Sequence, residues 1–395
     1  MMELQTEANS FSLQEVFSAY YEARRHKRGT ASQLSFELCL EDNLVLLWKE
    51  LCRREYVVGS SICFIIRDSV LREVFAADFR DRVVHHILYN RLSPFFERRF
   101  ICDSYSCRPG KGTLYGVQRL EHHIRSCSKN YTEDCYVLKL DIKGYFMHID
   151  RRILYGIIER SLPGDFPERE STLWLCRLVI GCEPVVNCRI KGNIHEWDAL
   201  PRDKSLFHTE SDCGMPIGNL TSQLFSNIYL NEFDQWIKRT CGIRHYGRYV
   251  DDFYIVHEDK SFLQGMIPRI RDFLRRELAL TLHPHKVYLQ HCTRGVRFLG
   301  FAVYPFHRLP SKKILGRAKR RFFEIEAGEH SPEGMRSVIN SYLGMFRHSA
   351  GIGYVKFLIA TYRAPFSVGY YSRVRDNFVF KLHRALREMT FSKLT

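Results

Sequence analysis

The chain has 395 residues, 45% of them hydrophobic, which is enough to bury a large core and to form two or three subdomains. Its 59 Lys and Arg against 44 Asp and Glu give a net charge of +15, which favours a polyanionic partner, and nucleic acid over membrane. No run of eighteen apolar residues and no signal-peptide order at the N-terminus occur, so we expect a soluble, cytoplasmic protein with no membrane partner.

In the N-terminal third, residues 12–56 are typical of two or more helices with basic surfaces joined at Gly29, and residues 57–79 of short strands and turns. Apolar residues at helical spacing predict a helix from about Asp81 to Leu92. The stretch 136–146 begins as an apolar strand.

Further along the chain, polar composition between Gly181 and Gly214 predicts a loop or hairpin insertion over residues 181–213. Residues 219–238 have the apolar spacing of a helix, and from about Ser311 onward the pattern is helical and basic. The thirteen cysteines form no Cys-x-x-Cys pair, so we interpret them as free thiols in a reducing compartment.

Two adjacent aspartates, Asp251 and Asp252, interrupt the stretch GRYVDDFYIVH between two apolar arms, which predicts a hairpin with both carboxylates at its bend. Their repulsion and desolvation oppose folding. Another apolar strand ends at Asp141. Three carboxylates at strand ends suit two Mg²⁺ ions about 3.5–4 Å apart, as in two-metal phosphoryl transfer. The alternative is a solvated turn, in which Asp-Asp is common.

Five motifs in order resemble those of the reverse transcriptases. DIKGYF resembles the first catalytic motif of that family and YVDD its catalytic tetrad. GMPIGNLTSQLFSNIYLNEFD, residues 214–234, matches the Gly-x-x-x-Ser motif, and LTLHPHKVYLQ and VRFLGFAVY resemble the lysine-bearing motif and the primer-gripping turn.

One departure from the wider family lies in the fourth motif, where IGNLTSQ has Ile217 before the glycine and Gln223 after the serine. That form, with FRDRVVHHILYNRLSPFFERRFICDSYSCRPGKGT and WDALPRDKSLF, resembles the reverse transcriptases of diversity-generating retroelements. The resemblance implies error-prone copying of a template-repeat RNA at adenines (mutagenic retrohoming). It also implies a small basic accessory protein that forms a pentamer, and a bacterial or phage source.

The resemblance implies an α+β right-hand polymerase. We expect N-terminal helices and fingers over residues 1–135, a palm with a small antiparallel sheet over 136–308, and a helical thumb over 309–395. The partners would be the template RNA and the cDNA or primer. Intron-type and retron-type reverse transcriptases stay as alternatives, as does a nucleic-acid-binding scaffold without polymerase activity.

The family resemblance also assigns roles. Asp141, Asp251 and Asp252 would be catalytic and bind two Mg²⁺ (Mn²⁺ being possible), with the backbone carbonyl of Ile142 completing one coordination shell. Phe146 would be an aromatic gate against the sugar 2′-hydroxyl, although a plain core phenylalanine is the alternative. The other nucleotide-binding candidates are Lys143, Gly144, Tyr145, Ile217, Gly218, Gln223 and Lys286, the last also as a general acid for pyrophosphate.

Basic residues outside the palm are further candidates. Arg108 and Lys111, in CRPGKGT, suit a flexible fingers loop that closes over the triphosphate, with a solvated basic loop as the alternative. Arg80 and Arg82 would bind the template backbone. Ile217 stands where most of the family has a glutamine that can hydrogen-bond near the template strand. We hypothesise that the loss of this hydrogen bond lowers discrimination at a template adenine. The alternative is that Ile217 only packs within the protein.

Overall fold

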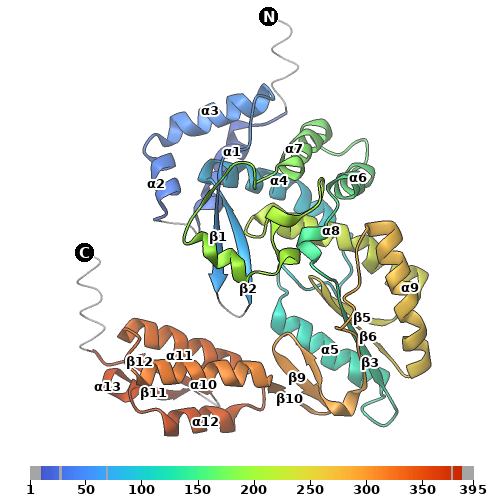
Figure 1. The fold of residues 1–395 in the computed structure, drawn as a ribbon, viewed down its shortest axis with the longest axis vertical. Coiled ribbons are helices and arrows are strands. Elements are labelled where there is room, and N and C mark those ends of the chain that lie inside the picture. Colours follow the sequence, from blue (N-terminus) through green and yellow to red (C-terminus); the bar gives the residue numbers. More distant parts are fainter. Residues whose placement is uncertain (1–9, 26–28, 68–69, 375–376, 385–395) are drawn as a thin grey trace, which may run out of the picture. The chain divides into compact units, whose positions relative to one another are not determined.

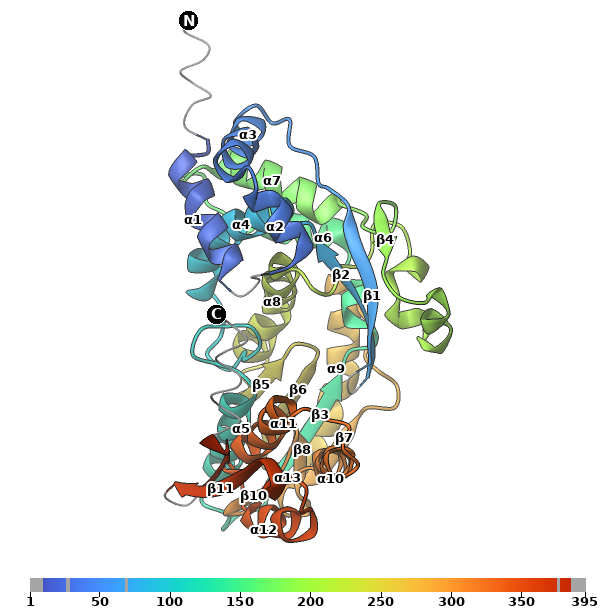
Figure 2. The same ribbon diagram turned by 90° about the vertical axis from the view of Figure 1, so that its left-hand side faces the viewer.

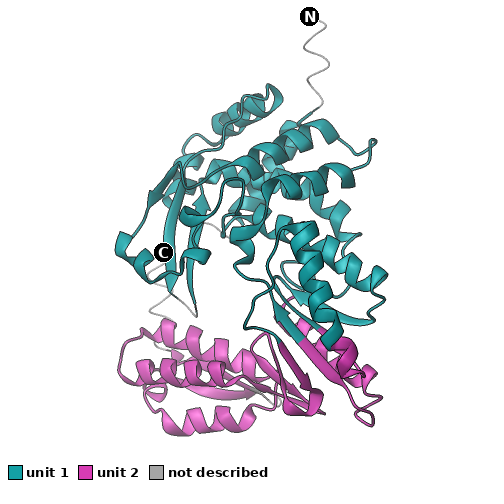
Figure 3. Cartoon of the chain, turned by 45° about the vertical axis from the view of Figure 1, so that its right-hand side comes forward, with its two compact units in different colours: residues 1–110, 139–254, 264–287 teal, residues 111–138, 255–263, 288–395 magenta. Residues whose placement is uncertain are grey.

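The computed structural model describes residues 10–25, 29–67, 70–374 and 377–384. The chain forms two compact units, coloured separately in Figure 3. Unit 1 comprises Met1–Gly110, Lys139–Tyr254 and Gln264–Val287, and unit 2 comprises Lys111–Leu138, Ile255–Leu263 and Tyr288–Thr395. Both units contain helices and antiparallel strands, so the predicted α+β class is confirmed.

Three helices open unit 1: α1 (Leu13–Arg24), α2 (Ala31–Glu37) and α3 (Leu40–Cys52). Ser12 and Thr30 cap the first two, because each side-chain oxygen accepts a hydrogen bond from the first turn. Gly29 lies between α1 and α2 with φ +84°, a left-handed conformation that glycine adopts without strain. The predicted helices and their break at Gly29 are confirmed.

A hairpin follows, made of β1 (Ser61–Arg67) and β2 (Leu71–Ala77), which pair antiparallel (Figure 1). Strand β4 (Cys188–Ile190) pairs with β1 in parallel on its other side (Figure 2). It belongs to the insertion of residues 181–213, whose remaining structure is three 3₁₀ turns rather than the hairpin that we allowed for. The insertion therefore extends the sheet of β1 and β2.

The helices of unit 1 beyond this sheet are α4 (Phe79–Glu97), α6 (Arg151–Ser161), α7 (Arg169–Gly181), α8 (Leu220–Gln235) and α9 (Lys260–Leu278) from Gln264 onward. The helices predicted at 81–92 and 219–238 are thus present as α4 and α8. Helix α8 is buried along most of its length, where it contacts α4 and α6. Polar side chains on α8 therefore need partners inside the protein.

A four-stranded sheet has the order β5-β6-β3-β7, with β5 (His245–Tyr249), β6 (Asp252–His257), β3 (Tyr136–Asp141) and β7 (Tyr288–His291). Unit 1 holds β5, the first half of β6 and the end of β3. Unit 2 holds β7 and the other halves of β3 and β6. The predicted strand before Asp141 and the predicted hairpin around Asp251 are both present.

Unit 2 also contains α5 (Thr113–Cys127) and an antiparallel sheet in the order β10-β9-β8, made of β8 (Val296–Phe298), β9 (Phe301–Tyr304) and β10 (His307–Pro310). Its C-terminal part has the helices α10 (Lys312–Glu326), α11 (Pro332–Phe346), α12 (Ile352–Thr361) and α13 (Pro365–Val368). Their apolar faces meet in one core, in which Phe322, Ile339 and Phe346 are among the buried residues.

The expectation of an all-helical C-terminal part is corrected by a hairpin, β11 (Gly369–Val374) and β12 (Asn377–Leu382), drawn in red in Figure 1. Phe380 and Leu382 are buried two residues apart, which is the period of a strand. Asn340 on α11 holds β12, because its amide donates to Phe380 O and accepts from Phe380 N–H at 2.9 and 2.8 Å. None of the helices in the described ranges is long and apolar enough to cross a membrane.

A buried ion pair connects α8 to β5. Arg248 Nη2 lies 2.6 Å from Asp234 Oδ2 and Nε 2.8 Å from Oδ1, and both side chains are 0% exposed. Tyr246 donates a further hydrogen bond to Asp234. The remaining Arg248 donors reach Ser104 Oγ at 3.2 Å and Val250 O at 3.0 Å. One side chain thus connects a helix, a strand, a loop and the hairpin turn.

We expect Asp234→Asn to lower the free energy of unfolding by about 3 kcal/mol or more, because it leaves a buried guanidinium without its counter-ion. Asp272→Asn is the matched control, since Asp272 pairs with Arg275 and Arg276 on the exposed face of α9. We expect that control to cost less than about 0.5 kcal/mol. Urea denaturation of the three proteins measures both values, and equal losses for the two variants would contradict the central role of the pair.

Candidate active site

The three predicted carboxylates lie at the ends of neighbouring strands. Asp141 is the last residue of β3, Asp251 lies in the turn between β5 and β6, and Asp252 is the first residue of β6. The backbone joins them, because Ile142 N–H donates to Asp251 O at 3.3 Å. Val250, before Asp251, has φ +56°, which is rare for a β-branched residue. The hydrogen bond from Arg248 to Val250 O holds this turn.

The environment of the hairpin disfavours negative charge. Burial raises the pKa of Asp251 to about 6, and the Asp141 and Asp252 carboxylates add to the shift. The pKa of Asp252 is also raised to about 6, mainly by burial, although Lys139 opposes the shift. The site is therefore strained electrostatically and gains from any cation that it binds.

Two lysines supply positive charge at these carboxylates. Lys139 Nζ lies 3.0 Å from Asp252 Oδ2, and Lys286 Nζ lies 2.8 Å from Asp141 Oδ1. Burial works to lower the pKa of Lys286, but its hydrogen bond and charge interaction with Asp141 raise the pKa overall. Lys286 was predicted to act near the phosphates, and it lies at the carboxylates.

Lys139 was not identified from the sequence as a residue of this site, although its position in the sequence indicates it. It precedes Asp141 by two residues on the same strand, so both side chains point to the same face of the sheet.

One oxygen of the site fits a metal ligand. Asp252 Oδ1 is buried and has no hydrogen-bond partner, which is uncommon for a carboxylate and costs free energy. Mg²⁺ prefers such carboxylate oxygens. In the present arrangement, no three His, Cys, Asp or Glu side chains among the described residues are grouped to hold a metal. Lys286 instead binds Asp141 Oδ1 and Lys139 binds Asp252 Oδ2, which leaves Asp252 Oδ1 open to a metal ion.

The residues after Asp141 have different surroundings. Lys143 is exposed, while Gly144 has φ +53° and lies so close to the insertion that an added Cβ would meet Asp203 O at 2.8 Å. The ring of Tyr145 is buried and its hydroxyl donates to Ser226 O at 2.6 Å, so the side chain packs in the core, and its role in nucleotide binding stays a prediction. Phe146 is half-buried.

The fourth motif places Gly218 and Gln223 at the protein surface, consistent with access to a ligand. Gly218 has φ +127°, and an added Cβ would meet Phe75 O at 2.8 Å. Ile217 and Phe146 both pack against an apolar cluster, and the Ile217 carbonyl accepts from Phe75 N–H at 2.9 Å. Ile217 therefore has a packing role, whatever else it does.

The role of Arg108 in a flexible loop that closes over the triphosphate stays a prediction, and in this structure the side chain is engaged within the protein. Its side chain is almost fully buried, pairs with Glu97 at 2.9 Å and donates to Ile101 O and Ser104 O. These contacts use the guanidinium to fix the loop itself. Lys111 belongs to unit 2, where its ammonium lies 5.6 Å from the Tyr115 ring centroid.

Arg80 and Arg82 are also engaged within the protein. Arg80 pairs with Glu50 and donates to Val57 O, and Arg82 donates to Ala77 O at 2.9 Å. Burial lowers the pKa of both guanidinium groups. These contacts anchor both side chains at the start of α4, and template binding by Arg80 and Arg82 stays a prediction.

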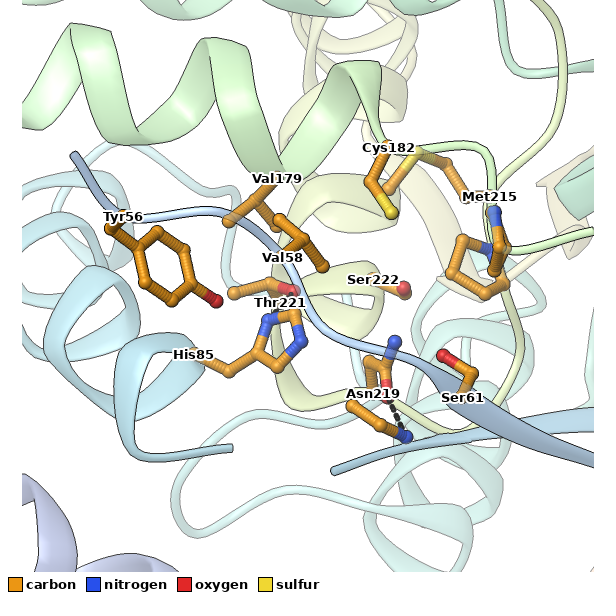
Figure 4. A pocket seen from close by; sticks show the side chains of 13 residues that line it. Tyr56, Val58, Ser61, His85, Val179, Cys182, Met215, Asn219, Thr221 and Ser222 are labelled. Carbon is orange, nitrogen blue, oxygen red and sulfur yellow. Dashed lines mark hydrogen bonds between the residues drawn. The ribbon is translucent and has the colours of Figure 1, made fainter. Parts of the chain in front are cut away.

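A small cavity lies beneath the fourth motif (Figure 4). Its volume is about 20 Å³, room for about one water molecule. Ser222 Oγ is buried at this cavity without a hydrogen-bond partner among the described residues. His85 Nδ1 and Thr221 Oγ1 are 2.8 Å apart on its wall, and Asn219 Oδ1 accepts from Ala77 N–H at 3.4 Å. The cavity thus lies between α4 and the start of α8.

The chain belongs to the reverse transcriptase family: the family model described as reverse transcriptase (RNA-dependent DNA polymerase) matches residues 69–303, more than half of the chain. The match includes all three aspartates and the fourth motif.

Two curated proteins are similar to the chain. Protein YkfC of Escherichia coli (strain K12) is 26% identical over 276 residues, which cover 62% of this chain and 64% of that protein. Nuclear intron maturase 1, mitochondrial, of Arabidopsis thaliana is 30% identical over 82 residues, which cover 21% of this chain and 10% of that protein. The chain therefore spans less than two-thirds of either relative.

Two solved structures are similar at low identity. Apo telomerase from Candida tropicalis, truncated from its C-terminal domain, matches with a TM-score of 0.47 and 12% identity over 64% of this chain and 55% of that one. Telomerase from Candida albicans, in complex with a TWJ fragment of telomeric RNA, matches with a TM-score of 0.45 and 11% identity over 82% of this chain and 60% of that one.

The imidazole of His85 makes the folded protein sensitive to acid. Burial lowers the pKa of His85 from 6.5 to about 4, with smaller effects from His86 and Arg82. As the pH falls below 6.5, His85 becomes protonated in the unfolded chain, whereas in the folded chain it stays neutral down to about pH 4. The free energy of unfolding therefore decreases across this window. The amide of His85→Gln can still form a hydrogen bond with Thr221 but does not titrate. Over this pH window we expect its free energy of unfolding to fall by about 3 kcal/mol less than that of the wild type.

The free energy of unfolding of both proteins, measured by urea denaturation between pH 4 and 7, tests this expectation. Parallel curves for the wild type and the variant would show that His85 is not the titrating group.

Proposed function

We propose that the chain is an RNA-directed DNA polymerase that extends a primer on an RNA template. The observation that carries the proposal is the meeting of Asp141, Asp251 and Asp252 at adjacent strand ends, with a buried oxygen of Asp252 lacking a partner. Family membership supports the same reaction. A scaffold without activity would have no need for three carboxylates that destabilise one another.

The three aspartates would hold two divalent ions, Mg²⁺ or Mn²⁺, and the Ile142 carbonyl would complete one coordination shell. When bound, such ions lower the pKa of the attacking 3′-hydroxyl and neutralise the leaving pyrophosphate. Lys286, 2.8 Å from Asp141, would release that carboxylate and turn to the phosphates, where an ammonium can donate a proton to pyrophosphate. Lys139 would hold Asp252 in position meanwhile.

The surface around the hairpin would bind the nucleotide. Lys143 follows the strand that ends at Asp141, Gly218 and Gln223 lie in the fourth motif, and all three are exposed. They remain the nucleotide-binding candidates together with Phe146, Ile217 and the backbone of Gly144. For Lys111 we retain a role at the triphosphate. The net charge of +15 supports binding of the template RNA and the growing cDNA.

We assign fingers to residues 1–135, palm to 136–308 and thumb to 309–395. The family model ends at residue 303, close to the proposed start of the thumb. The C-terminal bundle with its own core, α10 to β12, supports a separate thumb.

At a finer level, we propose that the enzyme serves a diversity-generating retroelement, with a basic pentameric accessory protein as its partner. The support is the fourth motif, with Ile217 before Gly218 and Gln223 after the serine. A second candidate is an intron-type reverse transcriptase, which the similarity to an intron maturase over 82 residues favours. The two candidates differ in fidelity at template adenines.

We expect Asp251→Asn and Asp141→Asn to lower primer extension to below about a hundredth of the wild-type rate, because each removes a charged metal ligand from the transition state. RNA affinity should change less than about threefold, since one carboxylate contributes little to phosphate binding.

Asp259→Asn is the control, because Asp259 is exposed beyond β6 and caps the N–H of Ser261. The assay is extension of a DNA primer on an RNA template with Mg²⁺. Extension by Asp251→Asn at the rate of Asp259→Asn would refute the proposed active site.

For the finer proposal we expect wild-type cDNA to carry errors mainly opposite template adenines. Ile217→Gln should lower that error about tenfold, since a restored hydrogen bond of about 1.4 kcal/mol discriminates to this extent. Sequencing of cDNA made by both proteins on a template with all four bases provides the measurement. Errors spread evenly over the four bases in the wild type would favour the intron-type candidate.

A further inference from the structure

A carboxylate far from the catalytic aspartates in the sequence organises the insertion. Glu73 on β2 is 1% exposed and accepts three hydrogen bonds of 2.7 Å, from Trp197 Nε1, Ser205 Oγ and Leu206 N–H. All three donors belong to the insertion, residues 181–213. No Lys or Arg in the described ranges forms an ion pair with Glu73. Its charge is therefore stabilised by these neutral donors.

The choice of glutamate follows from the geometry. Oε2 accepts from the Trp197 indole and the Ser205 hydroxyl, and Oε1 accepts from a backbone N–H. A carboxylate is an acceptor on both oxygens, whereas a glutamine amide directs an NH₂ group at one set of donors. With glutamine at position 73, the NH₂ group would point at one or more of these donors. At least one hydrogen bond would be lost, and part of the insertion would be released.

The same part of the insertion packs against the proposed nucleotide site. Leu206, whose N–H Glu73 holds, forms an apolar cluster with Cys63, Phe75 and Met147. Phe146, Trp197 and Ile217 pack against this cluster.

Hydrogen bonds continue the connection from the cluster to the site. Phe75, two residues after Glu73, donates its N–H to Ile217 O at 2.9 Å, and Met215 donates its N–H to Phe146 O at 2.8 Å. The Glu73 carboxylate and the two candidate residues for substrate choice are thus parts of one packed assembly in unit 1.

We propose that Glu73 is a positioning residue for substrate selection: through Trp197, Ser205 and Leu206 it fixes the apolar wall that sets the side chain of Phe146 against the nucleotide sugar. This inference rests on the proposed polymerase function. A wall held at three points keeps Phe146 from yielding to a 2′-hydroxyl, and loosening the wall admits ribonucleotides. Glu73 itself touches neither the nucleotide nor the metals.

The test compares Glu73→Gln with a matched control, Glu196→Gln. Glu196 lies in the same insertion, next to Trp197, but its carboxylate pairs with Arg67 at 3.5 Å. For each protein, kcat and KM are measured for a deoxynucleotide and for its ribonucleotide on an RNA template. We expect Glu73→Gln to reduce the preference for the deoxynucleotide about tenfold, mainly by lowering the KM for the ribonucleotide, and Glu196→Gln to keep it.

Trp197→Phe provides a milder second variant, because it removes one of the three donors and keeps an aromatic ring. We expect it to reduce the preference by a smaller factor and to fold where Glu73→Gln does not. A double-mutant cycle separates positioning from general destabilisation: in a Phe146→Ala background, Glu73→Gln should have no further effect on the preference.

The outcomes are distinct. If the wild type extends no primer, the proposed function fails. If the wild type extends primers and Glu73→Gln or, where that variant does not fold, Trp197→Phe discriminates as the wild type does, the polymerase proposal stands and this inference is overturned. Equal losses of preference with and without Phe146 would also overturn it, because Glu73 would then act by another route.

Discussion

The buried pair of Asp234 and Arg248 is the interaction on which the hairpin of Asp251 and Asp252 depends. Arg248 uses its donors on the Asp234 carboxylate, the Ser104 hydroxyl and the Val250 carbonyl, so it ties the turn to α8 and to a loop at once. The turn needs this support, because Val250 has a left-handed conformation that disfavours a β-branched residue. The desolvation cost of the pair is offset by good geometry, and what it contributes is a defined position for Asp251 and Asp252.

Buried carboxylates in unit 1 divide into two kinds by their partners. Asp234 is fully paired with Arg248 and Tyr246, and Glu73 is satisfied by three neutral donors. Asp81 likewise accepts from Tyr56 and from Gly59 N–H. Asp252 differs, since one of its oxygens is buried without a partner although Lys139 binds the other. A carboxylate whose bonding is complete stabilises the fold, whereas one left incomplete is available to a ligand.

Two lysines at the site reduce the repulsion between the three carboxylates. Without a cation, three neighbouring carboxylates would repel one another, and burial already raises the pKa of Asp251 and Asp252 to about 6. Lys139 and Lys286 each bind one carboxylate oxygen and so allow the hairpin to fold before a metal arrives. Lys286 is exposed on a loop, so its contact is the easier one to exchange.

The sequence by itself determined the local features of this protein. Apolar residues at period two and at helical spacing predicted the strands around Asp141 and Asp251 and the helices α4 and α8, because these patterns report burial of one face. The ordered motifs determined the family, and they predicted the catalytic role of Asp141, Asp251 and Asp252. The hairpin β11–β12 was missed, because its short alternating runs follow four helices and resemble their apolar spacing.

Only the tertiary structure decided which polar residues serve the fold. Arg108, Arg80 and Tyr145 were assigned to ligands from their motifs, but each is bound by protein atoms that the sequence does not mark as neighbours. Glu73 carried no signal, since its donors lie 124 to 133 positions away along the chain. The reason is physical: whether a charged or hydroxyl group meets solvent, a ligand or a protein partner depends on which distant segments pack around it, and local spacing contains no record of that packing.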